Sequence, residues 1–158
     1  MFEKSVELIN TGIADELTAV HQYMYYHFHC DDQGYELLST LFKRTAIEEM
    51  MHIERLADRI LFLKGEVELK AAAEVKKIHT PKEMLEHVTQ MEKDAVVMYN
   101  KFAIQATEGA DSATRKLFES LVDDEERHFS QFDKELENLH KFGENYLALQ
   151  SMERSKPQ

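Results

Sequence analysis

The sequence IEEMMHIERL runs from Ile47 to Leu56. It places Glu49 and His52 three positions apart, a spacing that puts both side chains on one face of an α-helix. The apolar residues around this pair recur at helical spacing, at Phe42, Ala46, Ile53, Leu56, Ile60 and Leu63. The stretch therefore predicts a long amphipathic helix that carries a carboxylate and an imidazole on its buried face.

The composition favours one helical domain. The chain has 158 residues, and only two prolines and five glycines interrupt it. A single cysteine, Cys30, excludes an internal disulfide framework and a cysteine-based zinc site. Because the net charge is −11, we expect no DNA partner. No apolar run has membrane-spanning length and no leader is evident, so we expect a cytoplasmic protein without a membrane partner.

Five periodic segments predict the helices. We expect these at about 2–31, 35–64, 81–108, 112–141 and 143–151, within a single domain that spans 1–158. At the start of the third segment, Thr80 and Glu83 predict a capping box, and Pro81 suits the first helical position.

The connections between these segments predict the topology. Short turns near Gly34 and Gly109 make the first two and the next two helices into antiparallel hairpins. The connection 65–80 can span roughly 50 Å when extended, and a helix of this length is only about 42 Å long. We therefore expect an all-α, four-helix bundle with one long crossover, which makes the second and third helices parallel, and a short C-terminal fifth helix.

Each of the four long segments has one glutamate within its apolar stripe. These residues are Glu16, Glu49, Glu92 and Glu125. A carboxylate in a core position is costly unless it is paired or binds a metal. Within each hairpin the two glutamates are 33 positions apart, and the midpoint falls beside the glycine turn. The chain therefore resembles a repeated hairpin, and its glutamates are expected at one height of the bundle.

The second helix of each hairpin adds a histidine three positions after its glutamate, at His52 and His128. Four carboxylates and two imidazoles supply the oxygen and nitrogen ligands for two iron ions. Bundles with di-iron centres use this ligand set. A third pair with the same spacing, Glu137 and His140, has no counterpart in the other hairpin, and we expect it to lie outside the site.

Other residues repeat around this pattern. Tyr23 and Tyr99 follow Glu16 and Glu92 by seven positions, and either a core role or a contact with the ligands is consistent with that spacing. Asp124 precedes His128 by four positions, as Glu48 precedes His52. These two carboxylates either orient an imidazole or pair with exposed charges.

At this point the sequence resembles the bacterioferritins. The stretches that carry the resemblance are ADELTAVHQY, IEEMMHIERLADRILFLKG, DDEERH and KFGENYL, and it covers nearly the whole chain. It implies a ferritin-like bundle in which the six residues are ligands of a ferroxidase centre, with Glu49 and Glu125 bridging the irons. It also implies that Fe(II) is oxidised by O2 or H2O2 and stored as Fe(III) mineral in a 24-subunit shell, built from two-fold dimers of one chain.

The resemblance implies two further partners. One is haem b, shared between two subunits and ligated by one methionine from each, here Met50; the other is a ferredoxin-type electron donor. On a helical wheel, Met50 and Met51 lie at equal angles on either side of the direction in which Glu49 and His52 point. The neighbours of Met50 are small or apolar, namely Ala46, Ile47, Ala57 and Leu61, whereas Met51 shares a charged face. An interface methionine without haem remains an alternative.

The chain departs from the better-studied bacterioferritins at three positions. Arg44 and Glu48 replace a histidine and an aspartate on the cavity side of the centre, and Gln131 replaces a tryptophan. Transfer of iron or electrons between the centre and the cavity is therefore expected to differ.

Other functions stay open. One is a rubrerythrin-like di-iron peroxidase, although the chain lacks the cysteine pairs of a rubredoxin module. The others are a di-iron hydroxylase or oxidase without storage and a non-enzymatic bundle. DNA-coating mini-ferritins are disfavoured because their ligands come from two subunits.

Overall fold

The computed structural model describes residues 2–154, which form five helices. These are α1 (Glu3–Asp32), α2 (Glu36–Phe62), α3 (Pro81–Glu108), α4 (Ser112–Phe142) and α5 (Asn145–Arg154). Their ends differ from the predicted ranges by up to three residues. Residue 1 and residues 155–158 of the predicted domain lie outside the described residues. In the part of the chain that the structure describes, no helix has the length and apolarity that a membrane crossing requires.

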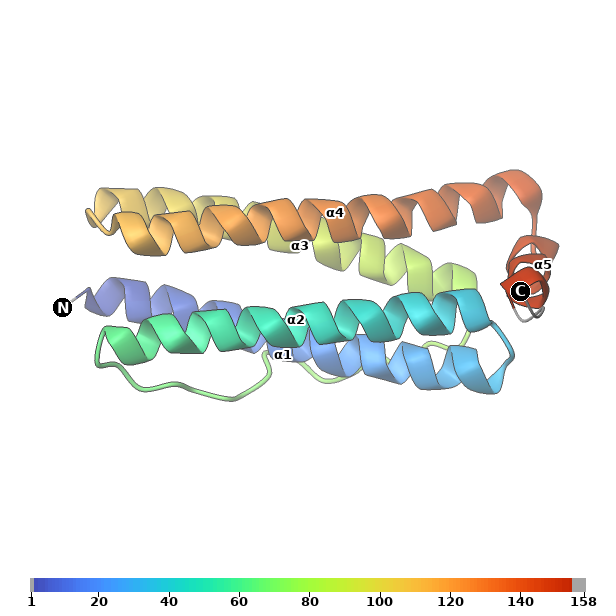
Figure 1. Cartoon of the computed structure of the whole chain (residues 1–158), viewed down its shortest axis with the longest axis horizontal. Coiled ribbons are helices and arrows are strands. Elements are labelled where there is room, and N and C mark those ends of the chain that lie inside the picture. The colour runs from blue at the N-terminus through green and yellow to red at the C-terminus, as the bar shows by residue number, and fades with distance from the viewer. Residues whose placement is uncertain (1, 155–158) are drawn as a thin grey trace.

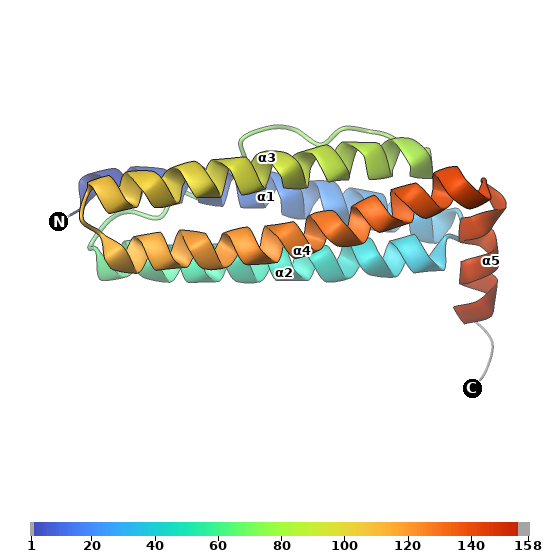
Figure 2. The same cartoon turned by 90° about the horizontal axis from the view of Figure 1, so that it is seen from above.

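Two antiparallel hairpins, α1 with α2 and α3 with α4, pack side by side as a four-helix bundle (Figure 1). Segment 65–80 returns along the bundle from the end of α2 to the start of α3, so these two helices run in the same direction. Helix α5 lies across one end of the bundle (Figure 2). The predicted all-α fold, with one long crossover and a short fifth helix, is confirmed.

Polar side chains of α1 hold the crossover in place. Asn10 donates a hydrogen bond to the carbonyl of Glu66 at 2.9 Å. Gln22 accepts from the backbone N–H of Lys76 at 2.8 Å and donates to its carbonyl at 3.0 Å. Thr18 lies between them along α1 and also accepts from backbone N–H groups of the crossover. The crossover therefore follows α1 because side chains of α1 satisfy its backbone polar groups.

The helix starts differ in how they are capped. At α4, the side chain of Asp111 accepts from the backbone N–H of Thr114 at 3.2 Å. The capping box predicted at the start of α3 is wrong, because Thr80 makes no side-chain cap hydrogen bond. Pro81 takes the first helical position there, and since it has no N–H it leaves one fewer donor for a cap to satisfy.

The core consists of two apolar clusters. The cluster towards α5 includes Tyr26, Leu38, Phe42, Met84, Phe132 and Leu147. The cluster towards the other end includes Ile9, Ile13, Leu56, Ile60, Phe118 and Leu121. Buried carboxylates and imidazoles lie elsewhere in the same helices, and Tyr23 of the first cluster and Tyr99 of the second contact them. The polar residues therefore form a layer between the two apolar clusters.

Gly12 lets α1 approach this layer closely. A β-carbon at Gly12 would lie 3.3 Å from both the ring and the hydroxyl of Tyr99, and 3.6 Å from Leu56 Cδ1. The Tyr99 side chain is fully buried, so it has little room to move away. The absence of a side chain at Gly12 thus allows the Tyr99 ring to pack against the backbone of α1.

We expect Gly12→Val to lower the free energy of unfolding by about 1–3 kcal/mol, the usual cost of overfilling a packed core. Chemical denaturation would measure it. Thr11→Val is the matched control, because it introduces the same side chain at the adjacent, exposed position, and it should change stability little. Equal stabilities of the two variants would contradict the packing described here.

Candidate metal centre

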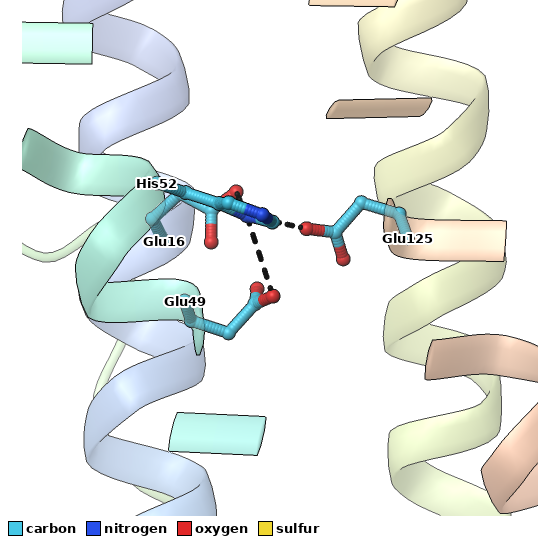
Figure 3. Close-up of side chains that lie close together, drawn as sticks. All are labelled: Glu16, Glu49, His52 and Glu125. Carbon is cyan, nitrogen blue, oxygen red and sulfur yellow. Dashed lines mark hydrogen bonds and ion pairs between the residues drawn. The ribbon is translucent and has the colours of Figure 1, made fainter. Parts of the chain in front are cut away.

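The structure brings together all six residues that the sequence analysis singled out as metal ligands. Glu16 lies on α1, Glu49 and His52 on α2, Glu92 on α3, and Glu125 and His128 on α4. None of these residues is more than 3% exposed. Figure 3 shows four of them, Glu16, Glu49, His52 and Glu125, pointing toward one another from facing helices.

The six residues form two overlapping groups. Ligand atoms of Glu16, Glu49, His52 and Glu125 lie within 4.8 Å of one another, and so do those of Glu49, Glu92, Glu125 and His128. Glu49 and Glu125 belong to both groups. Each group can hold one metal ion, and the two shared carboxylates are placed to bridge a pair of ions.

Oxygen atoms in this cluster lack hydrogen-bond partners. Both oxygens of Glu125 and one oxygen each of Glu16, Glu49 and Glu92 are buried without one, as is His128 Nδ1. His128 Nδ1 lies 2.9 Å from Glu49 Oε1, but without hydrogen-bond geometry. Buried polar atoms are normally satisfied. This donor set therefore fits cations that take oxygen and nitrogen ligands.

The electrostatics of the cluster indicate that protons replace cations when metal is absent. Burial, followed by repulsion from Glu125 and Glu16, raises the pKa of Glu49 well above its usual value. Burial also raises the pKa of Glu92. Burial lowers the pKa of His52, but its close contacts with the carboxylates of Glu125 and Glu16 outweigh burial and raise this pKa to about 10. Metal binding must therefore displace protons from the cluster.

Each tyrosine donates a hydrogen bond to the glutamate of the opposite hairpin. Tyr99 on α3 donates to Glu16 Oε1 on α1 at 2.6 Å, and Tyr23 on α1 donates to Glu92 on α3. Of the two roles that the sequence leaves open, the structure thus supports contact with the cluster. These bonds fix one oxygen of each carboxylate.

The outer nitrogens of the two imidazoles contact carboxylates of the opposite helix. His52 Nε2 on α2 donates to Asp124 Oδ2 on α4 at 2.9 Å, and His128 Nε2 on α4 donates to Glu48 on α2. A carboxylate accepts hydrogen bonds, so when each ring is neutral, as metal binding requires, its proton lies on Nε2 and its Nδ1 lone pair faces the cluster. Asp124 on α4 therefore orients His52 on α2, and Glu48 on α2 orients His128 on α4.

A pocket of about 140 Å³ reaches the cluster from the side of α1, α3 and the crossover. Glu49, Glu92 and Glu125 line its inner part, and Asp15 and Asp94 also line it. Burial and the nearby charge of Glu16 raise the pKa of Asp15 to about 7. Asp15 was missed by the sequence analysis because this residue lies beside the apolar stripe of its helix, where helical spacing gives no signal.

Other residues named from the sequence lie outside the cluster. Glu137 and His140 are exposed, as expected for an isolated motif. Met50 and Met51 are 47% and 54% exposed on α2, so exposure alone does not distinguish them. Arg44 lines pockets on the surface of α2, one of which also includes Gln131.

Arg127 is a second residue that sequence reasoning missed. Its guanidinium donates to Glu48 Oε2 at 2.7 Å and lies 3.7 Å from Asp124 Oδ1. The signal available was its place immediately before His128 and three positions after Asp124. Arg127 therefore touches both carboxylates that orient the imidazoles.

Comparison with known proteins gives a consistent result. Residues 6–142 match the ferritin-like domain family. The bacterioferritin of Desulfovibrio desulfuricans is 32% identical over 92% of this chain and 81% of its own length. The bacterioferritin of Rhodobacter capsulatus is 31% identical over 92% of this chain and 91% of its own length.

Solved bacterioferritin structures share the fold. That of D. desulfuricans covers 92% of this chain and 85% of its own, with a TM-score of 0.90 and 32% identity. The match to the Mycobacterium tuberculosis bacterioferritin covers 96% of this chain and 95% of that one, with a TM-score of 0.90 and 27% identity. The extent of the family match and the identity to these relatives establish that the chain belongs to the ferritin-like family, as one of the bacterioferritins.

Proposed function

We propose that this protein is an iron-storage ferroxidase, whose subunit oxidises Fe(II) at a di-iron centre and delivers Fe(III) to a mineral store. The observation that carries the proposal is the pair of buried ligand groups that share Glu49 and Glu125. The solved D. desulfuricans bacterioferritin is described with a di-iron site in different catalytic states. Two bound Fe(II) ions together supply the two electrons that reduce O2 to peroxide, or peroxide to water.

In this proposal each residue has a defined task. Glu49 and Glu125 bridge the two metal positions. Glu16 and His52 complete one position, and Glu92 and His128 complete the other. Four carboxylates balance the charge of two Fe(II) ions. The hydrogen bonds from Tyr23 and Tyr99 hold the terminal carboxylates in place, so the ligands are positioned before metal arrives.

Fe(II) reaches the centre, in this proposal, through the pocket on the α1 and α3 side. Asp94 and Glu74 line its wall beside Lys76, and Asp15 adds negative charge as it ionises; an acidic wall concentrates cations near the opening. The net charge of −11 per chain adds to this attraction.

The store itself requires an assembly of many copies. We propose a 24-subunit shell built from two-fold dimers, as the family resemblance implies, with a ferredoxin-type protein as the electron donor that releases iron. A native mass of one or two chains, and no iron beyond the centre, would instead favour a di-iron oxidase without storage.

Haem b is the second proposed cofactor, and Met50 is its proposed ligand. The R. capsulatus bacterioferritin is described with a haem iron in a crystallographic special position. In this chain, Ile47, Met50 and Leu61 are exposed apolar residues on α2. They offer an accessible thioether on an apolar surface, which suits haem held between two copies by the same residue of each.

We expect Glu49→Ala and Glu125→Ala to abolish fast Fe(II) oxidation, because each change removes a ligand shared by both metal positions. Stopped-flow absorbance after adding Fe(II) in air measures the rate, and native mass reports assembly, which should persist. Glu137→Ala is the control, since Glu137 belongs to the isolated motif on α4. Oxidation at the wild-type rate in both shared-ligand variants would refute the ferroxidase assignment.

We expect Met50→Leu to lose haem absorption bands while it keeps assembly and Fe(II) oxidation, because leucine preserves volume and apolarity without the sulfur. Met51→Leu is the matched control and should retain the bands. The measurement is the absorption spectrum after adding excess haem, with one haem per two subunits at saturation in the wild type. A full haem spectrum from Met50→Leu would show that Met50 is not the ligand.

A further inference from the structure

The charges around the centre do not balance with the ligands alone. Two Fe(II) ions offset the four ligand glutamates, which leaves the negative charges of Glu48 and Asp124 on the outer sides of the imidazoles. These two carboxylates are partly buried, with side chains 28% and 33% exposed. Because these carboxylates are partly removed from water, nearby cations stabilise their charges.

Two arginines supply those cations. Arg55 lies 3.4 Å from Asp124. Arg127 binds Glu48 with both terminal nitrogens, at 2.7 and 3.4 Å, and also lies 3.7 Å from Asp124. Among the described residues, Arg127 alone contacts both carboxylates, so it links the two imidazole supports into one network.

The contact with Glu48 is a charge-assisted, two-pronged interaction. The same carboxylate also accepts from His128 Nε2. Without Arg127, the imidazole of His128 would be the one remaining hydrogen-bond partner of Glu48 among the described residues.

We propose that Arg127 is a positioning residue, which acts through Glu48 and Asp124 to hold both imidazoles in the metal-binding orientation and so retains metal in the centre. This inference rests on the proposed function. It places a determinant of metal retention on the partly exposed side of α2 and α4, away from the pocket on the α1 and α3 side.

The test is the rate at which Co(II), bound at two ions per subunit, is released to excess chelator. Loss of partners that support metal ligands costs roughly 10–100-fold in affinity. Because Arg127 acts through such partners, we expect Arg127→Gln to release Co(II) about tenfold faster, near the lower end of that range. The Co(II) absorption bands should shift, because the imidazole geometry changes, while native mass should stay the same.

Two further variants make the test specific. Arg115→Gln is the matched control, since Arg115 also lies on α4 but pairs with Glu119 at 3.1 Å, and it should behave as the wild type. In a Glu48→Gln background, most of the effect of Arg127→Gln should disappear. A wild-type release rate and spectrum for Arg127→Gln, or a full effect in the Glu48→Gln background, would overturn the proposal.

The outcomes separate this inference from the proposed function. Wild-type protein that does not bind two Co(II) ions per subunit would refute the di-iron centre, and the role of Arg127 with it. Wild-type protein that binds two ions while Arg127→Gln releases them at the same rate would refute only the role of Arg127.

Discussion

The constraint on which the rest of the structure depends is the burial of four carboxylates at one level of the bundle. Removing a charge from water costs several kcal/mol even after the protein relaxes, and here the charges also repel one another. The chain offsets this cost with imidazoles, tyrosine hydroxyls and, in the proposed function, metal ions. Two apolar clusters, one on each side of the polar layer, supply the packing that holds the layer together.

Neither hairpin completes the site alone. Tyr23 and Tyr99 each bind a glutamate of the opposite hairpin, and each imidazole donates to a carboxylate of the opposite hairpin. The docking of the two hairpins therefore creates the site. Gly12 illustrates the coupling, because its missing side chain makes room for the tyrosine that binds Glu16.

Much of this arrangement could be predicted from the sequence because it depends on periodicity. Helical spacing determines which face of a helix a residue lies on, and its distance from the turn determines its height in the bundle. These two quantities were enough to predict the fold and the grouping of the six residues. Spacing does not fix the direction in which a side chain crosses to its neighbour. The sequence therefore did not reveal that Asp124 supports His52, that Glu48 supports His128, or that Arg127 contacts both supports. The capping box predicted at Thr80 was wrong for a similar reason: the sequence has the required residue types, but the Thr80 side chain makes no cap hydrogen bond.

The central claim, a two-ion centre inside one subunit, is tested most directly by anomalous X-ray scattering from crystals soaked in Fe(II) without oxygen. We expect two iron peaks per subunit, both in contact with Glu49 and Glu125. One peak should also contact Glu16 and His52, and the other Glu92 and His128. A single peak, or iron bound only outside the four-helix core, would contradict it.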